Sequence, residues 1–184
     1  MEKERSPHPT AADYIYEALV ELMKQKPYHE ITITDITKKA GVSRMAYYRN
    51  YKDKDDILIE HFREILARTK ERMVAESKKE YWTGYVQRSY QDPIVDHIMQ
   101  AGLLGRVLDM MLDAVKGLYQ TVYGLDVTDE RGELLVYQKQ GVLIGYLVYR
   151  RHHPERINID TLADQLMKVM DPGDFVEPGK DTVS

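Results

Sequence analysis

A basic segment, Thr34–Lys54, carries the side chains of this chain that are best suited to bind an anionic polymer. It holds six lysines and arginines against two aspartates, although the whole chain has a formal net charge of −4. Such cations neutralise nucleic-acid phosphates, and an arginine can also donate two hydrogen bonds to O6 and N7 of guanine. The segment therefore favours a small DNA-binding surface on an acidic protein. The alternative is that these cations are only solvated.

Two short helices joined by a tight turn are predicted to position the basic side chains. Thr34 is expected to cap a first helix, Asp35–Ala40, with Ile36 on its apolar side. Gly41 lies where a tight turn between helices requires a positive φ. Thr34 therefore marks the start of the first helix. Gly41 marks its end and the turn into a second helix.

The second helix is expected over Arg44–Tyr51, with Ser43 as its cap and Tyr47 on its buried side together with Tyr51. Two helices joined in this way form a helix-turn-helix unit, and the second helix of such a unit enters the major groove of DNA. Binding to DNA is therefore the leading hypothesis.

Each exposed side chain of the second helix can be given a role. Arg44, in the first turn, can reach a guanine, and Met45 and Ala46 can contact thymine methyl groups. Tyr48 is expected to point outward, where its hydroxyl can donate to a phosphate. Arg49 is equally compatible with a DNA contact and with solvation.

Helical periodicity continues along the chain and predicts an all-α fold. A disordered arm (1–9) and a flexible tail (173–184) are expected to flank a helix-turn-helix domain (10–56) and a second helical domain (78–172). The expected helices run from Thr10 to before Pro27 and from Asp53 to about Ser77. After the segment 80–90, a helix is expected from about Pro93, and helical spacing continues over 103–123. The last two helices are expected over 133–152 and from Asp160, as its cap, to Pro172.

Composition excludes several classes of protein. The chain has 184 residues and no cysteine, so disulfide scaffolds and zinc sites with cysteine ligands are excluded. It shows neither an apolar signal core nor a run of 18 apolar residues, which predicts a cytoplasmic protein without a membrane partner. We find no nucleophile–base pair, phosphate loop or metal cluster in the sequence, so we expect no enzyme activity, no metal and no cofactor.

The run ITITDITKKAGVSRMAYYRNYKDKDDIL resembles the helix-turn-helix of the TetR family of bacterial transcription regulators, and GVLIGYLVYRRHHPERINIDTLADQLMKVM resembles the last two helices of short family members. The resemblance implies a homodimer with DNA-binding heads and a helical part that holds an effector pocket. It places Arg44, Met45 and Ala46 at base edges. It places Tyr48, Asn50 and Lys54 at phosphates, with Thr34 capping the supporting helix near the backbone. Ser43 and Arg49 complete the candidate DNA-binding set.

Three residues depart from the commoner family pattern. Met45 stands where Gly, Ser or Pro is usual, Ala46 replaces a frequent Thr, and Asn50 replaces a frequent His. Because Met45 and Ala46 lie at positions that read bases, the operator sequence cannot be transferred from relatives.

A dimer would let two recognition helices read half-sites of a palindromic operator about one turn (~34 Å) apart. Small residues four apart in the helix around Tyr137–Tyr149 permit close approach of a second helix, although packing within one subunit is an alternative. The residues expected at the dimer interface are Gly141, Gly145, Val148, Leu162 and Leu166.

Tyrosine and methionine are abundant, with 14 and 9 copies, and many of them fall in the central helices. Such side chains can line an adaptable cavity, although core packing explains them equally well. The candidate effector contacts are Trp82, Tyr85, Tyr90, His97, Met111 and Tyr119, with Met99 and Tyr123 nearby. We therefore expect a repressor released by a small molecule; the alternative is a regulator whose helical domain binds a protein partner instead.

Overall fold

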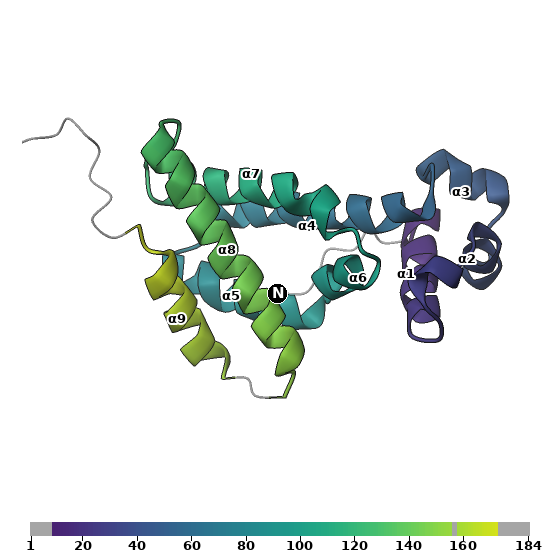
Figure 1. The fold of residues 1–184 in the computed structure, drawn as a ribbon. Coiled ribbons are helices and arrows are strands. Elements are labelled where there is room, and N and C mark those ends of the chain that lie inside the picture. The colour runs from purple at the N-terminus through teal and green to yellow at the C-terminus, as the bar shows by residue number, and fades with distance from the viewer. Residues whose placement is uncertain (1–8, 156–157, 173–184) are drawn as a thin grey trace, which may run out of the picture. The chain divides into compact units, whose positions relative to one another are not determined.

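The computed structural model of the chain describes residues 9–155 and 158–172, and this part of the chain is helical without a β-strand. The prediction of an all-α fold is confirmed, whereas the expected arm (apart from Pro9) and tail lie outside the described residues. Figure 1 shows the elements: α1 (Ala11–Met23), η1 (Tyr28–Glu30), α2 (Ile33–Ala40), α3 (Arg44–Asn50), α4 (Lys54–Ala75), α5 (Lys78–Gln91), α6 (Ile94–Gln100), α7 (Leu104–Val122), α8 (Glu130–His152) and α9 (Ile159–Met170).

The chain forms two compact units that divide α4 between them. The head unit comprises residues 9–64 and 94–106, and the body unit comprises residues 65–93 and 107–172. This division differs from the expected domain limits, because α6 and the start of α7 belong with the head. The amide of Gln100 donates to the Met23 carbonyl at 3.3 Å, and Arg106 pairs with Asp55 at 3.0 Å, which ties these residues to the head.

The core of the head is formed where α1, α2 and α3 pack together with the first turns of α4. Each helix contributes apolar side chains at helical spacing, and burying one such side chain stabilises the fold by about 1.5–3 kcal/mol. As expected, Tyr47 and Tyr51 of the recognition segment point into this core. The most deeply buried side chains are Ile15, Leu19, Ile36, Tyr47, Ile57 and Leu58.

The prediction that Thr34 caps α2 is wrong, because the helix begins two residues earlier. Thr32 is the cap: its hydroxyl accepts from the Asp35 amide at 3.1 Å, and the Asp35 carboxylate accepts from the Thr32 amide at 2.9 Å. Lys26 donates to the same carboxylate at 2.8 Å, and this bond, followed by those from Thr32, lowers the pKa of Asp35. This reciprocal pair satisfies two amides at the start of the helix.

The turn between α2 and α3 has the predicted form. Gly41 adopts a φ of +67°, in the left-handed region that glycine enters at little cost, and ends α2. The Ser43 hydroxyl accepts from the Ala46 amide at 3.1 Å and caps α3 as predicted. The helix ends at Asn50 because Tyr51 is already extended, with φ −139° and ψ 141°.

Lys54, at the start of α4, binds the connection between α1 and α2. Its ammonium group donates to the carbonyls of Tyr28 at 2.7 Å and Ile31 at 2.9 Å, and it lies 4.4 Å from the centroid of the Tyr28 ring. The hydroxyl of Tyr28 donates to Asp55 at 2.6 Å. Adjacent residues of α4 therefore hold η1 by its backbone and by its side chain.

In the body unit, α9 packs against α5 and touches α8 (Figure 1). Two predicted helix starts are wrong. α8 begins at Glu130, three residues early, because Asp129 accepts from the Gly132 amide at 2.7 Å. α9 is capped by Asn158, whose side chain accepts from the Thr161 amide at 2.9 Å, and Asp160 lies inside its first turn.

Within the described residues, every helix is too short or too polar to cross a lipid bilayer.

The cap of α2 can be tested by two neighbouring threonines. Thr32→Ala should lower the free energy of unfolding by about 1 kcal/mol, because it removes the acceptor for the Asp35 amide. Thr34→Ala should change it by less than about 0.5 kcal/mol, as is usual for exposed positions. Urea unfolding of both variants measures the difference, and equal losses would contradict the assignment of the cap.

Lys54→Met should lower the free energy of unfolding by about 1–3 kcal/mol, because the carbonyls of Tyr28 and Ile31 lose their donor. The matched change Lys52→Met removes an exposed charge two residues earlier and should have little effect. Urea unfolding again provides the measurement. A Lys54 variant as stable as the Lys52 variant would show that the bonds to η1 contribute nothing.

Candidate DNA interface

One face of α3 is open to solvent while the other is in the core. Met45 is 75% exposed and Tyr48 is 55% exposed, whereas Tyr47 between them is fully buried. The rings of Tyr47 and Tyr48 meet edge to face with centroids 5.3 Å apart, so the buried ring supports the exposed one. The structure therefore places Met45 and Tyr48 outward, as the helical spacing predicted.

Arg44 lies at the first position of α3 and is exposed. One guanidinium nitrogen donates to the Thr34 hydroxyl at 3.2 Å, and this is the role that Thr34 has in place of capping. The bond uses a single donor of a group that carries five. Arg44 is thus held at the start of the recognition helix with most of its donors available.

Two members of the predicted DNA-facing set have intramolecular partners that compete with a phosphate. The Asn50 amide donates to the Ala46 carbonyl at 2.7 Å, which leaves it one other N–H. The Lys54 ammonium group donates to carbonyls of η1, and a third one, that of His29, lies at 3.4 Å. A phosphate contact by Lys54 would have to displace these bonds, so the geometry gives Lys54 a structural role that sequence analysis missed.

Four further cations are exposed on and next to the two helices of the helix-turn-helix. Asp35 faces Lys26 and the Thr32 cap, so its charge is already compensated. The cations Lys38, Lys39, Arg49 and Lys52 are exposed on α2, on α3 and after it, and Ser43 and Ala46 complete the helix start. Exposed cations beside a recognition helix suit phosphate binding.

The predicted effector residues are divided between the two units. Trp82, Met111 and Tyr119 are buried in the core of the body, with Trp82 only 1% exposed, and Tyr85 and Tyr90 are half-buried there. His97 lies on α6 and belongs to the head instead. For the three buried residues, core packing is therefore the role that the structure shows.

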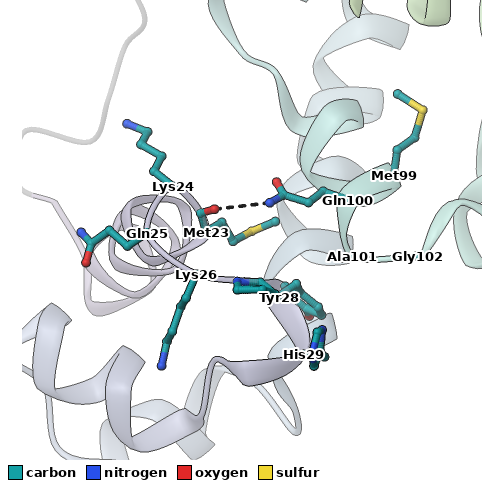
Figure 2. A pocket seen from close by; sticks show the side chains of 11 residues that line it. Met23, Lys24, Gln25, Lys26, Tyr28, His29, Met99, Gln100, Ala101 and Gly102 are labelled. Carbon is teal, nitrogen blue, oxygen red and sulfur yellow. Dashed lines mark hydrogen bonds between the residues drawn. The ribbon is translucent and has the colours of Figure 1, made fainter.

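The head has a hollow of about 610 Å³ lined by the end of α1, by η1 and by the end of α6. Figure 2 shows the side chains that line it. Met99, which sequence analysis named near the candidate effector contacts, lines this hollow. Gln100 and Met23 line it too, and they are joined by the hydrogen bond from the Gln100 amide to the Met23 carbonyl. Its wall carries the polar side chains of Lys24, Lys26 and His29.

The predicted dimer residues separate into two groups. Gly141, Gly145 and Val148 are exposed on α8, whereas Leu162 is half-buried and Leu166 is buried within its own protomer. A Cβ added at Gly141 or Gly145 would meet nothing within 4 Å, so packing inside the subunit does not explain these glycines.

Two large apolar side chains extend the same face of α8. Leu134 and Tyr137 are more than half exposed, and their spacing to Gly141, Gly145 and Val148 follows the turn of a helix. Sequence analysis missed both, although their i, i+3, i+7 spacing was a usable signal. The face from Leu134 to Val148, here called the α8 stripe, is an apolar surface of the kind that binds another protein.

Comparison with known proteins agrees with this geometry. Residues 15–60 match the profile of the bacterial regulatory proteins of the tetR family. The fatty acid metabolism regulator protein of Bacillus subtilis (strain 168) is 37% identical over 65 residues, which are 35% of this chain and 34% of that protein. The match thus spans about a third of that curated relative.

Solved structures share the fold over most of the chain. The fatty acid degradation regulator FadR from Bacillus halodurans has a TM-score of 0.64 and 18% identity, covering 88% of this chain and 98% of its own. The dihydroxyacetone kinase operon activator DhaS has a TM-score of 0.61 and 15% identity over 87% and 93% of the two chains. The transcriptional regulator FadR from Bacillus subtilis, solved in complex with stearoyl-CoA, has a TM-score of 0.57 and 18% identity over 87% and 97%.

At these identities the solved structures establish the fold alone. The profile match covers α2, the turn, α3 and most of α1, which are the elements that build the exposed face of the recognition helix. Residues 15–60 thus match the helix-turn-helix of the tetR family of bacterial regulatory proteins, and most of the chain shares the fold of these solved regulators.

Proposed function

We propose that this chain is a transcription regulator that binds a DNA operator as a homodimer and responds to a small molecule bound in its body unit. The observation that carries the proposal is the exposed face of α3, on which Arg44, Met45 and Tyr48 project from a helix anchored by Tyr47. An α-helix presented in this way fits the major groove, and the exposed cations beside it suit the phosphates.

The dimer is supported by the α8 stripe. Its glycines leave room for a second backbone, and its exposed apolar side chains would be removed from water on association. A second copy of this chain is the partner that a two-fold symmetric interface accommodates, since each copy presents the same surface. Two recognition helices would then read the two halves of a palindromic operator.

The first effector class to test is the acyl-CoA thioesters. The support is that FadR from Bacillus subtilis, which shares this fold, was solved with stearoyl-CoA. An effector shifts operator affinity only if it binds the two conformations unequally. The effector would relieve repression if it favoured the conformation in which the two recognition helices are spaced wrongly for successive major grooves.

The proposal is tested by selecting bound duplexes from a random pool and measuring their affinity with and without palmitoyl-CoA. The expected result is a palindromic consensus whose affinity falls when the thioester is added. A protein with no preference for any duplex over heparin at moderate salt would overturn the DNA-binding function. A consensus without a response to the thioester would remove this effector class only.

Arg44→Ala should weaken operator binding by about 1–3 kcal/mol and relax the preference at one base position, because it removes the fork that reads a base. Lys39→Ala, a matched change on α2, should weaken binding to all sequences alike and reduce its salt dependence. Titration of the operator and of single-base variants separates the two effects. An Arg44 variant with unchanged sequence preference would exclude this residue from base reading.

Gly145→Leu should dissociate the dimer while leaving the protomer folded, because the new side chain has open space in its own chain but occupies the α8 stripe. Gly105→Leu is the control, since that helical glycine on α7 also has nothing within 4 Å and lies outside the stripe. Analytical ultracentrifugation and circular dichroism report assembly and folding. A Gly145 variant that remains dimeric would place the interface elsewhere.

A further inference from the structure

Arg88, near the end of α5, is a half-buried cation whose hydrogen bonds are incomplete. Its Nη2 atom is shut off from solvent and has no hydrogen-bond partner among the described residues. A guanidinium stays charged in proteins, so burying it uncompensated is unfavourable. Burial, followed by the like charge of Arg72, lowers the pKa of Arg88. The free protein therefore carries a positive charge that its own side chains do not neutralise.

The surrounding charges do not balance Arg88. The carboxylate that acts on it is Glu76, and Arg72 shares that carboxylate, with Nη1 3.7 Å from Oε1. The other carboxylate oxygen, Oε2 of Glu76, is also buried and lacks a hydrogen-bond partner within the described chain. Two guanidinium groups thus face one carboxylate, and neither Arg88 nor Glu76 completes its hydrogen bonds.

Gly84 makes the position of Arg88 possible. One turn earlier on α5, its bare Cα leaves space for the guanidinium: a Cβ there would collide with Nη1 and lie 3.1 Å from Cζ. The absence of a side chain at position 84 therefore lets the charged group fold back along the helix. The same feature offers a way to displace the guanidinium without removing its charge.

The neighbours of Arg88 are aromatic. The rings of Tyr81 and Tyr85 stack with centroids 6.5 Å apart, and Trp82 meets Tyr85 edge to face at 5.6 Å. Burial raises the pKa of Tyr85, and the nearby charges of Arg150 and Arg88 oppose that rise. Arg150 is itself 5% exposed and donates to the Ser89 carbonyl, so a second cation lies in the same aromatic region.

We propose that Arg88 binds the anionic head group, a carboxylate or a phosphate, of an effector whose remainder is apolar. The guanidinium supplies the charge and a donor, Nη2, that has no partner, and the neighbouring rings of Tyr81 and Tyr85 suit an apolar chain. This inference rests on the proposed function, in that it names the chemistry of the effector expected in the body unit.

The test uses the full chain and three probes of equal chain length: decanoate and decyl phosphate below their micellar concentrations, and decanol below its solubility limit. Thermal unfolding should show that an anion stabilises the wild-type protein and that decanol does not. A response to decanoate alone assigns a carboxylate, and a response to decyl phosphate alone assigns a phosphate. Equal stabilisation by decanol, or no response to either anion, would overturn the inference.

Variants locate the response. Arg88→Gln should weaken the apparent affinity for the anion at least tenfold, and Gly84→Ala should weaken it as well because its methyl group displaces the guanidinium. Lys70→Gln removes an exposed charge from the body-unit part of α4 and should bind as the wild type does. An Arg88 variant with the wild-type response would assign the binding to another group.

A purely structural role of Arg88 predicts a different pattern. If the guanidinium only supports the fold, Arg88→Gln should lower the melting temperature without ligand and leave the anion response intact; the inference predicts an unchanged or raised melting temperature and a lost response. Operator binding is measured in parallel. Wild-type protein that binds an operator but no anion contradicts this inference alone, whereas anion binding without operator binding contradicts the proposed function.

Discussion

Lys54 and Asp55 impose the constraint on which the arrangement of the head depends. They are adjacent at the start of α4, and between them they bind the backbone of η1, the hydroxyl of Tyr28 and the guanidinium of Arg106. The α1–α2 connection and the start of α7 are therefore both attached to one turn of α4. Because Asp55 accepts from Tyr28 and from Arg106, a change in one contact alters the electrostatic environment of the other.

The exposed face of α3 is well defined because both the cap and the buried side of the helix are fixed. α3 has seven residues, and a helix of this length is not stable in isolation. It is held by the Ser43 cap at one end and by the buried ring of Tyr47 in the middle. The exposed side chains of α3 are therefore not needed for its stability and are available for contact with DNA.

The order of the helices and the helix-turn-helix could be predicted because they depend on local spacing. Gly41, Ser43 and the alternation of Tyr47 and Tyr48 act within a few residues, and the structure agrees with each of them. Sequence analysis assigns the cap of α2 to Thr34, although Thr32 is the same residue type and lies two positions earlier. Only the reciprocal bonds with Asp35, which fix the first turn, distinguish them.

The interactions that could not be predicted join residues far apart in the chain. Lys54 was expected at a phosphate because its charge and position suit that role, but the carbonyls it binds lie more than 20 residues earlier. For the aromatic residues of the body, sequence spacing does not separate a core side chain from a ligand contact, and the burial of Trp82 and Tyr119 decides in favour of the core. The burial of Arg88 could not be predicted from its sequence position, because a charged residue on a helix is usually exposed. Its burial depends on the space that Gly84 leaves one turn earlier.

Gly84 and Gly145 show how the same residue type serves two different ends in the body unit. At Gly84 the space left by the missing side chain is filled from within, by a guanidinium whose charge has no full complement. At Gly145 the space is open, beside exposed apolar side chains that water solvates poorly. Neither glycine adopts a positive φ, so backbone conformation explains neither of them. What remains is close approach: of a charged side chain at Gly84 and, in the proposed dimer, of a second helix at Gly145.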